Sequence, residues 1–188
     1  MSARLRELLD RIARVTAAEE WSDDLNPAQR SALAYLARAN RFSRAPSNVA
    51  DYLCTTRGTA SQTLKALERK GFIAKTPSPV DGRSISYEPT DLGHTALRAP
   101  SDLDTALSTI DAGDAERLST VLDTTLRAVL QRRGHRSFGV CKTCRHHRMT
   151  RDGYHCALLD VALSGEQREE LCHEHVAALD LAPGGVGG

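Results

Sequence analysis

Four of the five cysteines gather near the C-terminal end of the chain. Cys54 stands alone, whereas the other four fall within 32 residues: Cys141, Cys144, Cys156 and Cys172. The first two form a Cys-x-x-Cys pair, the third follows after 11 residues and the fourth after 15 more. A Cys-x-x-Cys turn presents two sulfurs to one ion, and two later thiolates complete a tetrahedron. We therefore predict that these four cysteines are the ligands of one metal centre.

The type of metal stays open. Zinc is the preferred ion, because a closed site of four thiolates is its commonest structural use and can fold a short segment. An iron-sulfur cluster is the alternative, because the third and fourth cysteines stand singly and do not form the second knuckle of a zinc ribbon. A histidine could also replace a cysteine, although we interpret these histidines as residues that surround the site or face solvent: His146, His147, His155, His173 and His175.

The composition and the apolar patterning indicate the class of the protein and its cellular compartment. Of its 188 residues, 40% are hydrophobic and 26% are charged, which is typical of a globular protein. No apolar run approaches the roughly 18 residues of a membrane span, and the start MSARLRELLD is charged where a signal peptide would be apolar. We expect a cytoplasmic protein without a membrane partner. In a reducing cytosol, clustered cysteines indicate metal binding more than disulfide bonds.

Positive charge is concentrated in one stretch, although the net charge is only +1. Residues 38–83 contain nine Lys or Arg and three acids, which gives +6. Residues 101–131 carry six acids against Arg117 and Arg127. The basic stretch could bind a polyanion such as double-stranded DNA.

The apolar spacing predicts a mainly helical protein with one β-hairpin. Asn26 is the expected N-cap of a helix with Pro27 at its first position, and Gly71 is the expected end of another. The expected helices cover residues 3–18, 27 to about 40, a short segment from Pro46, 59–70, a segment from Thr90 or Asp91 to about 107, and about 114–133. The expected hairpin strands cover residues 72–75 and 84–88.

Two helices joined by a short turn and followed by a hairpin form a winged helix-turn-helix. In the second helix, Ala60, Leu64 and Leu67 share one face, so the polar and basic side chains point the other way. Such a helix fits the major groove, and a wing arginine can enter the adjacent minor groove. The expected DNA contacts are Thr59, Ser61, Gln62, Lys65 and Arg69 on the helix and Arg83 on the wing.

The stretch VADYLCTTRGTASQTLKALERKGFIAKTPSPVDGRSISYEPTDLGHTAL is similar to the core of the MarR-type transcriptional regulators. The resemblance implies a homodimeric bacterial regulator, with repression the expected mode, that binds a pseudo-palindromic duplex. It implies that Thr59, Ser61, Gln62 and Lys65 contact DNA and that Arg83 is the wing arginine. It also implies DNA release when a small phenolic effector binds or a cysteine is oxidised. The family usually has a second basic residue in the wing, which Asp81-Gly82-Arg83 lacks.

The expected organisation has five parts. The two flanking helical regions are assigned to dimerisation, because their apolar stripes exceed what a small winged module can cover. The parts are an N-terminal dimerisation helix (1–24), the winged helix-turn-helix (25–100), C-terminal dimerisation helices (101–134), a cysteine-rich metal module (135–180) and a disordered tail (181–188).

Other functions remain as alternatives to a DNA-binding regulator with a structural or sensing metal. One is an iron-sulfur regulator that senses redox state, and another is a zinc-dependent adaptor for protein interactions. An enzyme is not expected, because four thiolates leave no open metal position for water. The lone Cys54 is expected to be a small buried thiol, because no second cysteine lies near it in the sequence.

Overall fold

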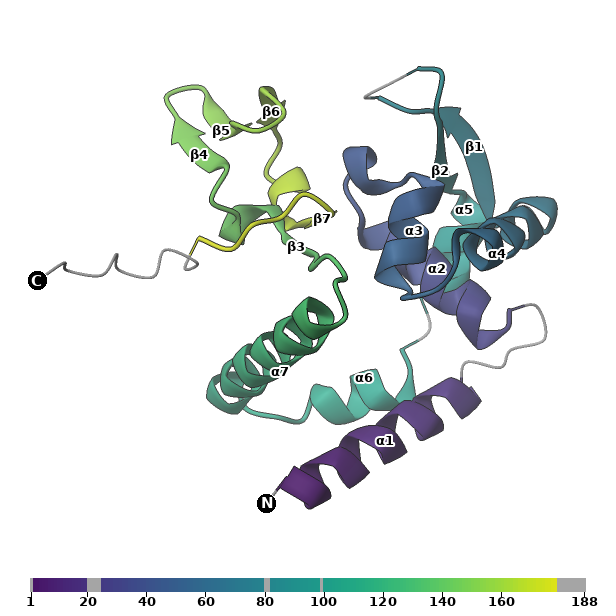
Figure 1. Ribbon diagram of the computed structural model, residues 1–188, viewed down its shortest axis with the longest axis vertical. Helices are drawn as coiled ribbons and strands as arrows, with labels where there is room; N and C mark the ends of the chain where they lie inside the picture. Colours follow the sequence, from purple (N-terminus) through teal and green to yellow (C-terminus); the bar gives the residue numbers. More distant parts are fainter. Residues whose placement is uncertain (1, 20–24, 80–81, 99, 179–188) are drawn as a thin grey trace, which may run out of the picture.

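The computed structural model describes residues 2–19, 25–79, 82–98 and 100–178, and the predicted tail at 181–188 lies outside them. The described chain forms a winged-helix lobe, three further helices and a small C-terminal module built from short strands (Figure 1). No helix in these ranges is long and apolar enough to cross a membrane.

Helix α2 (Pro27–Arg38) begins as the sequence predicts. The Asn26 side chain accepts a hydrogen bond from the Gln29 backbone N–H, and the Gln29 side chain accepts one from the Asn26 backbone N–H. This capping box satisfies two backbone donors at the helix start. The helix ends at Arg38, two residues before the expected position, and Ala39 and Asn40 leave it in an extended conformation.

The helix-turn-helix follows the 3₁₀ turn η1 (Arg41–Ser43) and consists of α3 (Pro46–Tyr52) and α4 (Arg57–Arg69). Helix α4 begins two residues earlier than predicted, because Thr56 caps it by accepting a hydrogen bond from the Thr59 N–H at 3.1 Å. The chain leaves α4 through Gly71, whose φ of +80° favours glycine.

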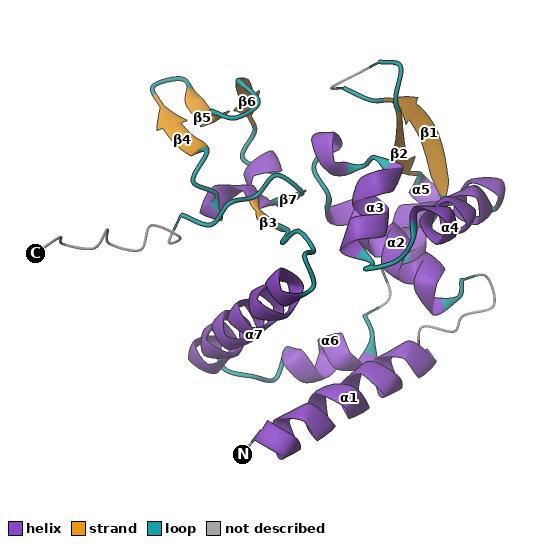
Figure 2. Cartoon of the chain, in the orientation of Figure 1, coloured by secondary structure: helices purple, strands orange, loops and turns teal. Residues whose placement is uncertain are grey.

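The predicted wing is an antiparallel hairpin of β1 (Ile73–Pro77) and β2 (Ile85–Pro89), in register from Ile73 opposite Pro89 to Pro77 opposite Ile85. Figure 2 shows it projecting from the helices of the lobe. One hydrophobic core lies beneath the helices and the base of the hairpin, and it includes Leu33, Leu36, Val49, Leu64, Leu67, Phe72 and Tyr87.

One predicted helix is wrong in extent. The segment from Thr90 to about residue 107 forms two helices, α5 (Asp91–Ala96) and α6 (Asp102–Leu107). Pro100 lacks a backbone N–H and disfavours helix in the residue before it, which breaks the helical run. Ser101 then starts α6 as an N-cap and accepts a hydrogen bond from the Asp104 N–H at 3.0 Å.

In Figure 1, helix α1 (Ser2–Glu19) lies beside α6 and below the winged-helix lobe, and helix α7 (Ala112–Arg132) follows α6 and lies below the C-terminal module. Both follow the predicted periodicity, and Gly134 with φ +66° follows α7. Their large apolar side chains are exposed: Leu5, Leu8, Leu9, Ile12 and Val15 on α1 and Leu118, Val121, Leu122, Leu126 and Val129 on α7.

The C-terminal module contains two small sheets. Strand β3 (Gly139–Val140) pairs with β7 (Leu171–Cys172), and β4 (His147–Thr150), β5 (Gly153–Cys156) and β6 (Val161–Leu163) form an antiparallel sheet. The 3₁₀ turns η2 (Cys141–Thr143) and η3 (Gln167–Glu169) complete it. Leu171 belongs to the same hydrophobic core as α2 and α4, so the module packs against the winged-helix lobe.

Candidate nucleic-acid interface and cysteine cluster

Helix α4 divides cleanly into a buried and an outward face. Ala60, Leu64 and Leu67 are fully buried against the lobe, as the spacing predicts. The expected contact residues lie on the rest of its surface: Thr59, Gln62, Lys65 and Arg69 are exposed and Ser61 is partly buried. The Thr59 hydroxyl lies 2.9 Å from the Thr56 hydroxyl, so Thr59 also supports the helix N-terminus.

The charge on this face is available for a ligand. In the described part of the chain, no ion pair joins Lys65 or Arg69 to an acid. Lys75 on β1 differs, because its ammonium lies 2.9 Å from Glu68 on α4, and this hydrogen bond raises the pKa of Lys75. That contact joins the wing to the helix.

The wing arginine lies where the sequence predicts it. Arg83 is exposed in the turn that precedes β2, while Val80 and Asp81 of the same tip lie outside the described residues. At the base of the wing, the Arg44 guanidinium lies 3.5 Å from the Glu88 carboxylate and donates to the Ala39 carbonyl at 2.8 Å. Arg44 therefore stabilises the fold at the base of the hairpin.

Residues 23–84 match the model of the MarR family. This segment contains the helix-turn-helix and most of the wing, and it includes every residue of the outward face described above.

Solved structures share the MarR-like fold. The Staphylococcus aureus MepR–DNA complex superposes with a TM-score of 0.51 at 21% identity, covering 68% of this chain and 96% of MepR. Streptococcus pneumoniae FabT in complex with DNA gives 0.54 at 24% identity, covering 70% of this chain and 98% of FabT. Close to a third of this chain therefore has no counterpart in these two proteins. A comparison with curated proteins gave no match.

The four clustered cysteines line one cavity, although they lie far from the MarR-like segment in the sequence. The cavity has a volume of about 320 Å³, including its opening to solvent. Imidazole, aliphatic and carboxylate side chains line it together with the four sulfur atoms. The lining residues are Cys141, Cys144, Cys156, Cys172, His146, His147, Leu158, Leu159, Leu163 and Glu174. The structure thus brings together the four residues that the spacing singled out.

Hydrogen bonds to sulfur hold two of these cysteines. The Asn40 Nδ2 donates to the Cys141 Sγ at 3.4 Å, and the Val176 backbone N–H donates to the Cys144 Sγ at 3.5 Å. Cys141 and Cys172 are buried and hydrogen-bonded to each other, which raises the pKa of Cys141 and lowers the pKa of Cys172 to about 6. The Asn40 amide acts to lower the pKa of both thiols, whereas burial acts to raise it.

The chemistry of this donor set fits a metal centre. Thiolates that accept N–H bonds and lie in a partly apolar pocket are the ligands used by zinc and by iron-sulfur clusters. One zinc would require sulfur atoms about 3.8 Å apart. In the described residues, no three His, Cys, Asp or Glu side chains are already gathered closely enough to hold one ion. Binding a single ion therefore requires the side chains to close inward.

The histidines divide into those at the cavity and those around it. His146 and His147 line the cavity, and the buried His147 Nε2 has no hydrogen-bond partner among the described residues. Burial, with the neighbouring Arg168 and Arg148, lowers the pKa of His147 and favours its neutral form. His155 pairs with Asp160 at 3.1 Å and His173 with Glu174 at 3.0 Å. His147 is thus the histidine best placed to supplement the cysteines.

The lone Cys54 corrects a sequence-based expectation. Its side chain is exposed and its φ is +50°, so it is not a buried thiol. The left-handed conformation turns the chain between α3 and α4 and leaves the sulfur outside the core. It lines a pocket between the end of α3 and α7 that also includes Tyr52, Leu126, Leu130 and Phe138.

The sequence did not reveal the residues that join the cysteine module to the MarR-like lobe. The Phe138 ring packs edge-on against Tyr35 and Tyr52, with centroids 5.7 and 5.2 Å away. Asn40 is only 4% exposed. A single asparagine after a helix carries no signal that its amide will be buried against a cysteine 101 residues away.

Proposed function

We propose that this protein is a homodimeric DNA-binding transcriptional regulator, a repressor of the MarR type, with a metal centre in its four-cysteine module. The observation that carries the proposal is the exposed face of α4, whose Gln62, Lys65 and Arg69 lie beside a wing that bears Arg83. MepR and FabT, which share the fold, were each crystallised with DNA.

Each side chain on this face has chemistry suited to a duplex. Gln62 can pair with the N6 and N7 of adenine, and Lys65 can reach guanine or a phosphate. Arg69, one turn further along α4, lies where it can neutralise backbone phosphate. Arg83 can enter a minor groove, whose narrow form attracts guanidinium groups. Thr59 and Ser61 at the start of α4 complete the set with short hydroxyl groups.

Exposed apolar helices support the homodimer. Val121 and Val15 are 61% and 60% exposed, and each belongs to a helix with several other large apolar side chains exposed in a single protomer. Contiguous exposed apolar surface of this kind marks an interaction site. A second copy of the chain would bury α1 and α7 and place two α4 helices on one duplex with two-fold symmetry, as a palindromic site requires.

A gel shift with a salt titration tests the DNA-binding function. Wild-type protein is used to select duplexes from a random-sequence pool, and its affinity is then measured across salt concentrations. A regulator selects a palindrome and shows a steep loss of affinity with salt. The reason is that its lysine and arginine side chains release counterions from the phosphates on binding, and added salt opposes this release. A protein-interaction adaptor selects no sequence and shows no steep salt dependence.

Zinc is the first choice for the metal and an iron-sulfur cluster the alternative. Zinc is redox-inert, so it would act as a structural brace, whereas a cluster would sense oxygen, nitric oxide or iron supply. Metal analysis and an absorption spectrum of protein purified without oxygen separate the two. A colourless protein with about one zinc per chain supports the brace. A brown protein that absorbs in the visible range supports the sensor, and protein without metal contradicts both.

A small phenolic effector is the remaining part of the proposal. The pocket between the end of α3 and α7 supports it, because leucine and aromatic side chains line it beside polar groups such as Asp51 and Arg127. Titration with simple phenolic acids is expected to raise the melting temperature and lower DNA affinity. Unchanged melting and unchanged affinity across a set of such acids would remove the effector from the proposal.

A further inference from the structure

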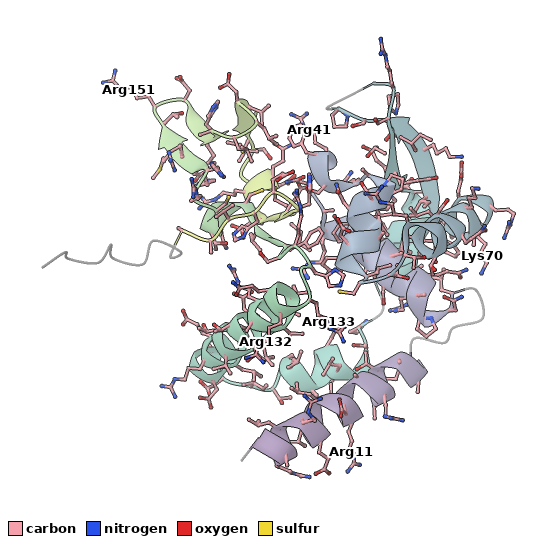
Figure 3. All side chains as sticks on the ribbon, in the orientation of Figure 1. Arg11, Arg41, Lys70, Arg132, Arg133 and Arg151 are labelled. Carbon is pink, nitrogen blue, oxygen red and sulfur yellow. The ribbon has the colours of Figure 1, made fainter. Side chains whose placement is uncertain are left out.

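The cysteine module contacts the winged-helix lobe at the corner between α2 and α3, residues 39–43. The Asn40 backbone N–H donates to the Leu171 carbonyl at 2.8 Å, and Ala39 forms a parallel bridge with Leu171. The His173 backbone N–H donates to the Ser43 hydroxyl at 3.0 Å, and the His173 Nδ1 lies 3.2 Å from the same hydroxyl. Figure 3 shows Arg41, from this corner, in the space between the lobe and the module.

The Asn40 side chain joins the corner to the cysteine cluster. Its Oδ1 accepts hydrogen bonds from the Phe42 N–H at 3.1 Å and from the Ser43 hydroxyl at 2.7 Å, and so fixes the turn η1. Its Nδ2 donates to the Cys141 Sγ at 3.4 Å. One buried amide therefore uses its acceptor to shape the turn and its donor to bind a sulfur that lines the cavity.

The corner in turn fixes parts of the DNA-binding surface. The Tyr35 hydroxyl donates to the Ser43 carbonyl at 2.6 Å, which attaches the turn to α2. The Arg44 carbonyl accepts the Tyr87 N–H of β2 at 3.2 Å, which attaches the next residue to the wing. Helix α3, which packs against α4, starts two residues later at Pro46. A displacement of residues 40–44 is therefore expected to move the wing and α3 together.

We propose that Asn40 couples metal occupancy of the four-cysteine site to DNA affinity, an inference that rests on the proposed metal centre and DNA-binding function. A metal-bound thiolate is a charged acceptor and forms a stronger bond with the amide than a neutral thiol does. With metal bound, Cys141 holds Asn40 in the orientation that fixes η1. Without metal, the amide bonds a neutral thiol, which is a weaker acceptor, and the corner is held less firmly in this geometry. Metal binding thus favours the DNA-binding conformation.

The test compares DNA affinity with and without metal in three proteins: wild type, Asn40→Asp and Asn26→Asp. Asn40→Asp keeps the oxygen that accepts from Phe42 and Ser43 and replaces the donor to Cys141 with a negatively charged carboxylate oxygen. Asn26→Asp is the matched control, because Asn26 also caps a helix through its Oδ1 but lies at the start of α2. Each protein is stripped with a chelator, then reloaded with the metal that wild type carries as isolated, at concentrations that give full occupancy. The probe is the duplex that wild type selects.

For wild type and Asn26→Asp we expect metal to tighten DNA binding about tenfold, which corresponds to about 1.4 kcal/mol. For Asn40→Asp we expect the DNA affinities of the metal-free protein and of the fully metal-loaded protein to agree within about twofold, a difference of roughly 0.4 kcal/mol. An Asn40→Asp protein that keeps the tenfold response would overturn the inference. So would a wild type whose DNA affinity is the same with and without bound metal.

Failure of the underlying function gives a different result. Wild type without any metal contradicts the metal centre, and wild type without DNA binding contradicts the regulator. If Asn40→Asp does not fold, Ser43→Ala provides the test, because it removes the hydroxyl that bonds both Asn40 and the His173 N–H. A reduced metal response in Ser43→Ala supports the coupling, and an unchanged response overturns it.

Discussion

The backbone of Gly139 lies directly against the imidazole ring of His175. A Cβ atom at Gly139 would overlap the ring at Nδ1, Cγ and Cε1. His175 is 5% exposed, and its Nε2 lies 2.9 Å from the Thr143 hydroxyl in η2. Glycine at position 139 therefore lets the buried ring pack beside the turn that carries Cys141.

Gly139→Ala is expected to displace His175 and with it the turn of the Cys-x-x-Cys pair. Overpacking of this kind typically costs about 1–3 kcal/mol. The measurement is metal content after purification together with the melting temperature. Gly165→Ala is the control, because a Cβ there has no neighbour within 4 Å. Equal metal content and melting temperature in the two variants would contradict the packing described here.

Gly93→Ala is expected to destabilise the winged-helix lobe. A Cβ at Gly93 in α5 would overlap the Phe72 carbonyl and lie 3.1 Å from the Leu33 Cδ1, and backbone cannot rotate away as a side chain can. We expect the free energy of unfolding to fall by about 1–3 kcal/mol. Denaturant unfolding measures this. Gly58→Ala is the control, because a Cβ at Gly58 in α4 meets only the Thr56 hydroxyl at 3.8 Å, and this variant should be more stable by about 0.5–1 kcal/mol. An equal loss of stability in Gly58→Ala would refute the steric explanation for Gly93.

Arg83→Ala is expected to weaken binding to all duplexes and to reduce the salt slope by about one unit, because one cation near the phosphates is lost. Affinity measured across salt concentrations gives this slope. Arg151→Ala is the matched control, because Arg151 is an exposed arginine at the tip of the β4–β5 hairpin in the cysteine module (Figure 3). If both variants keep the wild-type slope, the wing does not contact DNA.

Gln62→Ala is expected to relax preference at one base position of the selected duplex. A bidentate contact to adenine discriminates by about 1–3 kcal/mol, and its loss leaves nonspecific binding almost unchanged. Affinities for duplexes substituted at each position measure this preference. Gln131→Ala on α7, another exposed helical glutamine, should leave the whole profile unchanged. A Gln62→Ala profile identical to wild type would show that base recognition lies elsewhere on the protein.

Replacing Leu122 and Leu126 on α7 with Asp is expected to separate the dimer or unfold it, because the change buries charges in the proposed interface. Sedimentation at several protein concentrations gives the oligomeric state. Leu92→Asp on α5 is the control, since Leu92 is an equally exposed leucine outside α1 and α7. A stable dimer in the double variant would exclude α7 from the interface.

The sequence by itself determined the local elements and the residue types of the site. The Asn26 cap, the 3.6-residue spacing of Ala60, Leu64 and Leu67 and the alternation in the hairpin depend on neighbours in sequence, so the pattern predicts them. The Cys-x-x-Cys pair is a local signal too. Pro100 is local as well, yet the cap at Thr90 or Asp91 led to the prediction of one helix where there are two.

Only the tertiary structure decided which distant segments meet. It placed Leu171 in the core of the MarR-like lobe, left Cys54 exposed and set the Asn40 amide against Cys141, 101 residues along the chain. These contacts depend on how preformed elements pack, and many sequences with the same local pattern could pack differently. A buried polar group is stable when it is hydrogen-bonded, and the Asn40 Nδ2 finds its partner in a distant segment, so the local sequence does not predict this contact.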